Sequence, residues 1–215
     1  INMKVLNLYA CLGGNRALYP KNCEVTAVEL DPELARIYKE LFPNDKVIVA
    51  DAHQYLLDHY SEFDFIWSSP PCPSHSRIRL TNTGEGERKS KATYADMKLY
   101  EEIILLQNFF KGKYCVENVI SYYEPLIKPI KFDRHYYWSN FAIDTTFNID
   151  KQRPNLFRMN KKQLEEYHKI DLSSYKGNQR KDKILRNLVE PSVGKMIFEC
   201  ANSTYQKDTK QIKLF

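Results

Sequence analysis

Two side chains in this sequence have the types that covalent catalysis requires. Cys72 follows Pro70 and Pro71, whose rings restrict the backbone and predict a rigid turn. Glu117 lies within an apolar run, so its carboxyl group is a candidate acid. A thiolate can add to an electron-poor ring while an acid assists at a ring nitrogen. A lone loop cysteine is more often inert than reactive, so the prediction depends on Cys72 and Glu117 lying close together.

The elements that must position these side chains are short buried strands. Six apolar runs predict them: residues 4–10, 24–30, 46–50, 63–67, 114–119 and 136–141. Between them, Asp31 and Pro32 predict the start of a helix that continues to Leu41. Strands that alternate with helices predict an α/β fold, in which a doubly wound, mostly parallel sheet carries helices on both faces.

Two further helices are predicted from apolar spacing. One covers residues 93–110, with Tyr100, Ile103, Ile104 and Gln107 near its buried stripe. The other covers residues 190–201, and its apolar face comprises Val193, Met196, Ile197 and Cys200. Residues 77–92 are polar and predict a long mobile loop of the kind that often closes over a ligand.

Several polar or small residues follow the predicted strands at the points where the strands end. In order along the chain they are Gly13 and Gly14, Glu29, Asp51, Cys72 and Glu117. Ligands of doubly wound sheets bind beyond the carboxyl ends of the strands. The sequence therefore predicts one site at that edge of the sheet.

Composition narrows the class of protein. The formal net charge is +5 with a pI near 8.8, which permits contact with a phosphate backbone. The five cysteines include no Cys-x-x-Cys pair, so we expect no disulfide framework and no metal site, and a reducing, cytoplasmic setting. No apolar run approaches the roughly 20 residues that span a bilayer, and the first residues show no signal peptide, so we expect no membrane partner.

The order of these motifs resembles that of the DNA cytosine-5 methyltransferases over nearly the whole chain. The segment from Leu8 to Gly14 resembles the cofactor loop of that family, usually written Phe-x-Gly-x-Gly-Gly. The Ser69-Pro70-Pro71-Cys72 turn resembles the Pro-Cys nucleophile motif, and residues 117–119 match its Glu-Asn-Val motif. Residues 133–136 stand where the family has Arg-x-Arg, and residues 187–201 resemble its last motif.

The resemblance implies a Rossmann-like S-adenosylmethionine-dependent methyltransferase sheet that methylates carbon 5 of a flipped cytosine and releases S-adenosylhomocysteine. Cys72 would add to carbon 6, Glu117 would assist at nitrogen 3, and Arg134 would hold the base. The implied cofactor-binding residues are Tyr9, Ala10, Cys11, Gly13, Gly14, Glu29, Leu30, Asp51, Ala52, Pro70, Ser192 and Val193.

Three departures from the family pattern bear on the site. Ala10 stands where a glycine is common, Pro73 replaces a glutamine, and Tyr136 replaces the second arginine of Arg-x-Arg. The region for target recognition is also small. We expect a catalytic core at residues 1–140, a reduced recognition region at 141–186, a returning helix at 187–203 and a tail at 204–215.

The expected partner is double-stranded DNA. The candidate contacts are Ser74, Arg77, Arg79, Arg153 and Arg180, although a solvated surface is at least as plausible for any one of them. The last residues resemble the Gln-x-x-Leu-Phe peptide that docks into the bacterial sliding clamp, with Gln211, Leu214 and Phe215 as its anchors. The alternatives for the same residues are a frayed tail and a tail whose last two residues pack on the core of the protein itself.

Three alternatives stay open on the sequence. An exocyclic amino methyltransferase would use Ser69-Pro70-Pro71 but needs an aromatic residue at Cys72. A transfer RNA substrate would keep the cysteine mechanism, and a catalytically weak binding protein would not need Cys72 and Glu117. We expect a monomer of phage or prophage type in a bacterial cell. The target sequence and a partner endonuclease remain open.

Overall fold

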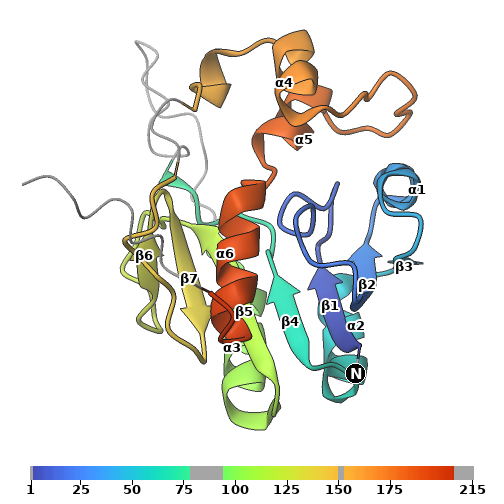
Figure 1. Cartoon of the computed structure of the whole chain (residues 1–215). Coiled ribbons are helices and arrows are strands. Elements are labelled where there is room, and N and C mark those ends of the chain that lie inside the picture. The colour runs from blue at the N-terminus through green and yellow to red at the C-terminus, as the bar shows by residue number, and fades with distance from the viewer. Residues whose placement is uncertain (1, 78–93, 150–152, 206–215) are drawn as a thin grey trace, which may run out of the picture.

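Parallel strands form the centre of the molecule, as the apolar runs predict. The computed structural model describes residues 2–77, 94–149 and 153–205. Within these residues one sheet has the order β3-β2-β1-β4-β5-β7-β6 (Figure 1). Its strands are β1 Met3–Leu8, β2 Cys23–Glu29, β3 Lys46–Val49, β4 Phe65–Ser68, β5 Lys113–Val119, β6 Ile130–Phe132 and β7 His135–Ser139. The first five pair in parallel, and β7 runs antiparallel to β5 and β6.

Helices α1 Pro32–Leu41, α2 Ala52–His59 and α3 Lys98–Phe109 connect the parallel strands. Helices α4 Lys161–His168, α5 Lys181–Arg186 and α6 Pro191–Ala201 follow the last strand. Asp31 caps α1 as predicted, because its side chain accepts hydrogen bonds from the backbone of Glu33 and Leu34. In the described part of the chain, none of the helices is long and apolar enough to cross a bilayer.

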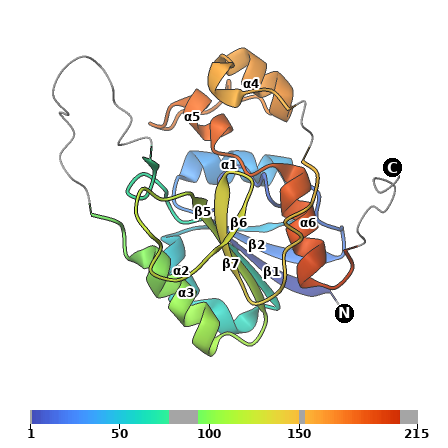
Figure 2. The same ribbon diagram turned by 90° about the vertical axis from the view of Figure 1, so that its left-hand side faces the viewer.

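Alternate residues of each strand supply the two faces of the sheet. Val5, Phe65 and Cys115 pack with α6, whereas their neighbours Leu6, Ile66 and Val116 pack with α2 and α3. The two sets of helices lie on opposite sides of the sheet (Figure 2). This alternation is the period-two pattern of a strand buried on both faces. It assigns Glu117, two residues after Cys115, to the face that α6 covers.

Helix α3 differs from its prediction in start and in phase. It begins at Lys98, five residues after the predicted start, and Ile104 is 51% exposed rather than buried. Gln107 is also exposed. The buried stripe instead contains Leu99, Tyr100, Glu102, Ile103 and Leu106. The prediction of Ile104 and Gln107 was therefore wrong, because the buried stripe includes Glu102, whose carboxylate is satisfied by hydrogen bonds from other segments.

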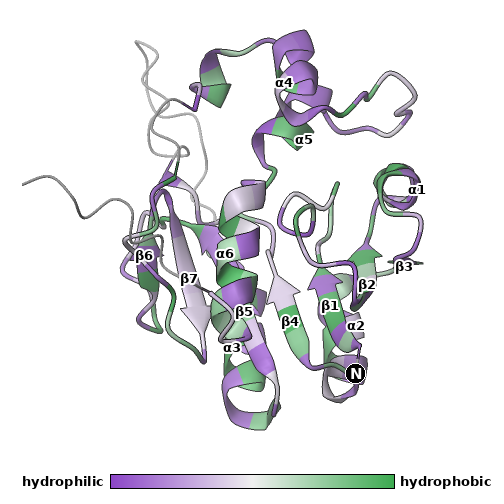
Figure 3. Cartoon of the chain, viewed as in Figure 1, coloured by the Kyte–Doolittle hydropathy of each residue, from purple (hydrophilic) through white to green (hydrophobic). Residues whose placement is uncertain are grey.

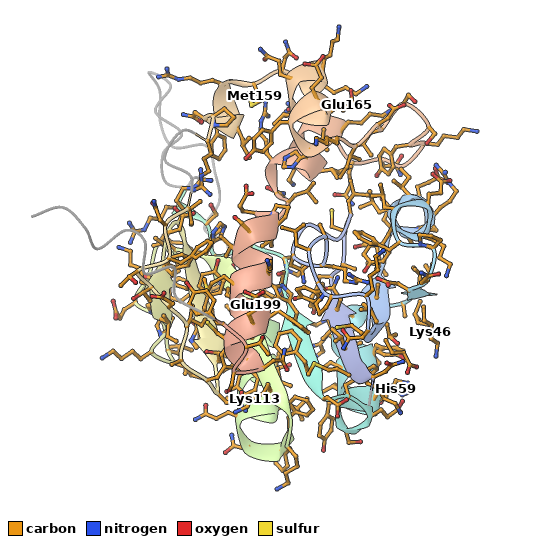
Figure 4. All side chains as sticks on the ribbon, in the orientation of Figure 1. Lys46, His59, Lys113, Met159, Glu165 and Glu199 are labelled. Carbon is orange, nitrogen blue, oxygen red and sulfur yellow. The ribbon has the colours of Figure 1, made fainter. Side chains whose placement is uncertain are left out.

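The described residues of the region 141–186 do not form a core of their own. Ile143 packs in the cluster that α6 covers, whereas Leu164, Tyr175 and Leu185 form one cluster with Leu12 after β1 and with Leu34 of α1. The outer surface of α4 is hydrophilic (Figure 3). Met159 and Glu165 mark this region beyond the carboxyl ends of the strands, opposite the end where Lys113 begins β5 (Figure 4). The region is therefore packed onto the edge of the sheet where the site is predicted.

Candidate active site

The turn that carries Cys72 is tied to the neighbouring strand by a buried hydrogen bond. The side-chain amide of Asn118 in β5 donates to the carbonyl oxygen of Pro70 at 3.0 Å. The carbonyl of Cys72 accepts from the backbone N–H groups of His75 and Ser76, both at 3.0 Å, which closes the turn after the thiol. Because β4 and β5 pair in parallel, Cys72 and Glu117 follow neighbouring strands at the same edge of the sheet.

Burial and two charged neighbours shift the pKa of the Cys72 thiol. Burial raises the pKa of Cys72, and the negative charge of Glu117 raises it further. The positive charge of Lys183, from α5 in the region 141–186, opposes this shift. Without a substrate, the thiol therefore holds its proton more firmly than an exposed cysteine would.

Glu117 faces a histidine that the sequence did not single out. In the antiparallel ladder Glu117 pairs with Tyr137 and Val119 pairs with His135, which puts His135 on the same face as Glu117. The Nε2 of His135 lies 3.4 Å from the Glu117 carboxylate. Tyr136, at the position of the second family arginine, pairs with Asn118 and packs with the apolar cluster on the other face of the sheet, which contains residues of α2 and α3. The position of His135 beside Glu117 follows from the register between β5 and β7, which the sequence does not reveal.

Arg134 lies in the turn before β7 and is half exposed. Its Nε is 3.7 Å from the carboxylate of Asp133, with 51% of the side chain exposed. The same carboxylate binds Arg153 at 2.7 Å, and Arg153 is 19% exposed. Burial raises the pKa of Asp133, but the hydrogen bond and charge of Arg153 outweigh it and hold that pKa low. The structure thus brings His135, rather than Arg134, into contact with the Glu117 carboxylate.

The remaining candidate DNA contacts lie at the same end of the molecule or outside the described residues. Ser74 accepts a hydrogen bond from the backbone of Asp96, and the guanidinium of Arg77 donates to the carbonyl of Ser121. Arg180 is 78% exposed and pairs with Asp182. Arg79 and the proposed clamp anchors Gln211, Leu214 and Phe215 are outside the residues that the structure describes.

The loop after β1, which the sequence predicts to bind the cofactor and which we call the cofactor loop, is tightly turned. Tyr9, Cys11 and Gly13 all have positive φ, at 55°, 47° and 69°. A Cβ on Gly13 would lie 2.5 Å from the ring of Phe42, so glycine is required there. Ala10, which replaces a family glycine, is buried and its N–H bonds the carbonyl of Val28 in β2. The extra methyl group is therefore accommodated.

Glu29 holds this loop through its carboxylate. One oxygen accepts from the N–H of Cys11 at 2.8 Å and the other from the N–H of Asp31 at 2.9 Å. Burial raises the pKa of Glu29, although these two hydrogen bonds oppose the shift. Leu30 and Val49, at the ends of β2 and β3, are 68% and 56% exposed. A carboxylate flanked by exposed apolar side chains fits an adenosine, which has a ribose diol and an apolar ring.

The other predicted cofactor residues have structural contacts as well. Asp51 caps α2, accepting from the N–H of Gln54 at 3.0 Å, and Ala52 is buried beneath it. Pro70 is buried, as is Val193 in α6, while Ser192 is partly exposed. A Cβ on Gly14 would lie 2.4 Å from the carbonyl oxygen of Val189, so the segment before α6 touches the cofactor loop. Val189 was not predicted.

The buried carboxylate of Glu102, which the sequence analysis did not single out, connects the loops after β1 and β4 through hydrogen bonds. Glu102 of α3 is fully buried and accepts from the hydroxyls of Tyr9 at 2.5 Å and Ser68 at 2.6 Å. The Nδ1 of His53 lies 3.1 Å from the same carboxylate. The hydrogen bond to Glu102 raises the pKa of His53. This network joins the ends of β1 and β4 to the start of α2. Among the described residues no cluster could hold a metal ion.

The fold and the site together define a Rossmann-like methyltransferase of the S-adenosylmethionine-dependent class. Residues 3–120 match the family described as C-5 cytosine-specific DNA methylase. This match covers more than half of the chain, and the protein belongs to that family. A search of curated proteins returned no match.

Solved structures resemble part of the chain at low identity. The chain is similar to the Escherichia coli protein yhhF, with 18% identity, a TM-score of 0.41 and coverage of 65% of this chain and 75% of that one. It is also similar to a SAM-dependent methyltransferase from Agrobacterium tumefaciens (16%, TM-score 0.42, coverage 57% and 40%). A third is a mutant of DNMT2 from Spodoptera frugiperda (23%, TM-score 0.36, coverage 54% and 35%). The chain thus spans well under half the length of the latter two.

Proposed function

We propose that this protein methylates carbon 5 of cytosine in duplex DNA through a covalent bond between Cys72 and the base. The observation that carries the proposal is the buried hydrogen bond from Asn118 to Pro70. It ties the turn of Cys72 to the strand of Glu117, and the thiol and carboxyl interact electrostatically. A nucleophile beside an acid is the arrangement that addition to a pyrimidine ring requires.

The cofactor would lie against the loop after β1. Glu29 would bind the ribose hydroxyls, Leu30 would pack against the adenine, and Asp51, at the next strand end, would lie near it. Tyr9, Ala10, Cys11, Gly13, Gly14, Ala52, Pro70, Ser192 and Val193 complete the proposed set. S-adenosylmethionine supplies an electrophilic methyl group when bound. We propose no metal.

The residues of this chain would act in sequence on a flipped base. The Cys72 thiol would give up its proton to solvent and its sulfur would bond to carbon 6, while Glu117 would donate a proton to nitrogen 3. Carbon 5 would then take the methyl group of S-adenosylmethionine, which leaves as S-adenosylhomocysteine. A base removes the carbon 5 proton, the sulfur–carbon bond breaks, and the nitrogen 3 proton returns to Glu117. Arg134, His135 and Arg153 supply positive or polar groups around Glu117 and Asp133, where the base would be held.

The DNA would lie across the end of the molecule that carries residues 141–186. We propose contacts from Ser74, Arg77, Arg79, Arg153 and Arg180, in which a small recognition region serves instead of a separate domain. Arg180 is 78% exposed and free to exchange Asp182 for a phosphate. Flipping the base costs a few kcal/mol, which these contacts would offset.

Methyl transfer from labelled S-adenosylmethionine to duplex DNA tests the proposal. We expect transfer to DNA and none with Cys72→Ser, whereas Cys23→Ser, at the opposite end of the sheet, should retain activity. DNA containing 5-fluorocytosine should trap the protein covalently, because no proton can leave carbon 5 after methylation. Activity that survives Cys72→Ser would favour amino methylation, and transfer only to RNA would refute the DNA substrate.

The sliding-clamp proposal stands on residue types alone. Gln211, Leu214 and Phe215 would anchor a peptide whose docking raises the local concentration of the enzyme at DNA. Fluorescence anisotropy of the peptide 205–215 with a bacterial clamp tests it. We expect binding that Leu214→Ala and Phe215→Ala abolish, and equal anisotropy with and without clamp would refute the idea.

A further inference from the structure

Tyr175, in the region between β7 and α6, reaches across to the end of β2. Its hydroxyl donates a hydrogen bond to Oδ2 of Asp31 at 2.7 Å. The residue is 4% exposed and belongs to the apolar cluster that contains Leu12 and Leu34. Burial, and after it the charge and hydrogen bond of Asp31, raise the pKa of Tyr175 to about 12. The hydroxyl is therefore a neutral donor at physiological pH.

Asp31 forms hydrogen bonds through both its carboxylate and its backbone N–H. Its Oδ1 caps α1 by accepting from the N–H of Glu33 at 2.9 Å, and its backbone N–H donates to Oε1 of Glu29 at 2.9 Å. The other oxygen of Glu29 accepts from the N–H of Cys11 in the cofactor loop. Tyr175 thus bonds the side chain of Asp31, and the backbone of Asp31 is linked through the Glu29 carboxylate to Cys11.

The segment around Tyr175 is held against α1 by other contacts. The N–H of Lys176 donates to the carboxylate of Glu33 at 3.2 Å, and the guanidinium of Arg36 donates to the carbonyl of Ser174 at 3.2 Å. Gln179 adds a long amide contact to Asp31 at 3.4 Å, next to the exposed Arg180. Among these contacts, the hydrogen bond from the Tyr175 hydroxyl is the shortest, and it ends on Asp31, which adjoins the proposed cofactor site.

We infer that Tyr175 is a positioning residue of the cofactor site, which acts through Asp31 to orient Glu29 and so links the recognition region to cofactor affinity. This inference rests on the proposed function, because Glu29 must bind the ribose for its orientation to matter. A hydrogen bond that ends on a charged group contributes more than a neutral one, so its loss should be felt along the chain of partners.

Two variants and one matched control test the inference. Tyr175→Phe removes the hydroxyl and leaves the ring in its cluster. Asp31→Asn removes the charge but keeps an oxygen that can cap α1. Tyr205→Phe is the control, since Tyr205 also donates its hydroxyl to an aspartate, Asp144, at 3.0 Å but lies away from α1. Binding of S-adenosylhomocysteine is measured by calorimetry, and kcat and KM for the cofactor by methyl transfer.

We expect Tyr175→Phe to raise the Kd for S-adenosylhomocysteine by at least about five-fold and to raise KM with little change in kcat. Asp31→Asn should have a similar effect, and the double variant should be less than additive because both act on one link. Tyr205→Phe should bind like the unmodified protein even if its melting temperature falls. A merely structural role for Tyr175 would lower the melting temperature and leave Kd and KM unchanged.

The outcomes separate this inference from the proposed function. If the unmodified protein binds no S-adenosylhomocysteine, the proposed cofactor site fails. If it binds and Tyr175→Phe binds equally well, the positioning role is overturned while the proposed function stands. Fully additive effects of Tyr175→Phe and Asp31→Asn would also overturn it, because the two residues would then act separately.

Discussion

The side-chain amide of Asn118 reaches from β5 to the carbonyl oxygen of Pro70, 3.0 Å away, and both residues are buried. The hydrogen bond spans two neighbouring strands and ends two residues before Cys72. It fixes the nucleophile turn to the strand that carries Glu117. The relative position of thiol and carboxyl thus depends on an amide that takes no part in the chemistry.

Asn118→Ala should lower kcat by about 10- to 100-fold, because a small displacement of a reacting group is costly. The buried carbonyl left without a donor should lower the free energy of unfolding by about 1–3 kcal/mol. Asn140→Ala is the control, since Asn140 also bridges two segments but at the opposite end of β5. Single-turnover kinetics and denaturant unfolding measure the two effects. Equal losses of kcat in both variants would argue against a role in placing Cys72.

The reactivity of Cys72 should depend on its two charged neighbours in opposite directions. The charge of Glu117 raises the pKa of Cys72 and that of Lys183 lowers it, with burial as the largest influence. Glu117→Gln should therefore accelerate alkylation of Cys72 by iodoacetamide at pH 8 by about two- to ten-fold, and Lys183→Gln should slow it. Mass spectrometry of the Cys72 peptide measures the rate. An unchanged rate in Glu117→Gln would show that the two groups do not interact.

The contact between Gly14 and Val189 should be intolerant of a methyl group. Gly14→Ala would put a Cβ 2.4 Å from the carbonyl oxygen of Val189, so the cofactor loop and the segment before α6 would have to separate. We expect a loss of about 1–3 kcal/mol of stability and weaker binding of S-adenosylhomocysteine. Gly112→Ala creates an equally close approach, to the carbonyl of Asp64, at the other end of the sheet. That variant should lose stability but, once folded, bind normally.

The buried pair of His53 and Glu102 should make stability depend on pH. The hydrogen bond to Glu102 raises the folded-state pKa of His53 above its unfolded value near 6.5. Its contribution is then complete below that value and is lost as pH rises through the folded-state pKa. The free energy of unfolding should therefore fall above pH 6.5 more steeply in the unmodified protein than in His53→Asn. His59→Asn, which breaks an exposed pair with Glu62, should keep the steep slope.

Much of the sheet could be predicted because buried parallel strands leave continuous apolar runs. The strands ending near Glu29, Cys72 and Glu117 all formed as expected. Helix α2 was missed although Asp51 is a good N-cap, since eight residues give little periodicity. Strand β6, with three residues, gives still less.

The misses at the site have a common cause in contacts between distant segments. Glu102 is buried because Tyr9, His53 and Ser68 all bond its carboxylate, and none of the three is near it in sequence. His135 faces Glu117 only because of the register between β5 and β7. The motif order could place residues 133–136 at the Arg-x-Arg position of the family. It could not predict that the side chain of His135 lies on the same face of the sheet as Glu117.

The apolar cluster that joins Leu164 and Tyr175 to Leu12 and Leu34 has a consequence for redesigning the enzyme. Larger recognition modules can be exchanged between proteins when each folds by itself. Here the region 141–186, moved into another protein, would lack the apolar side chains against which it packs. This protein, without the region, would have Leu12 and Leu34 exposed. If the region 141–186 reads DNA as proposed, changes of sequence preference should therefore be sought by single substitutions on the outer surface of α4 and α5, and chimaeras should be expected to misfold.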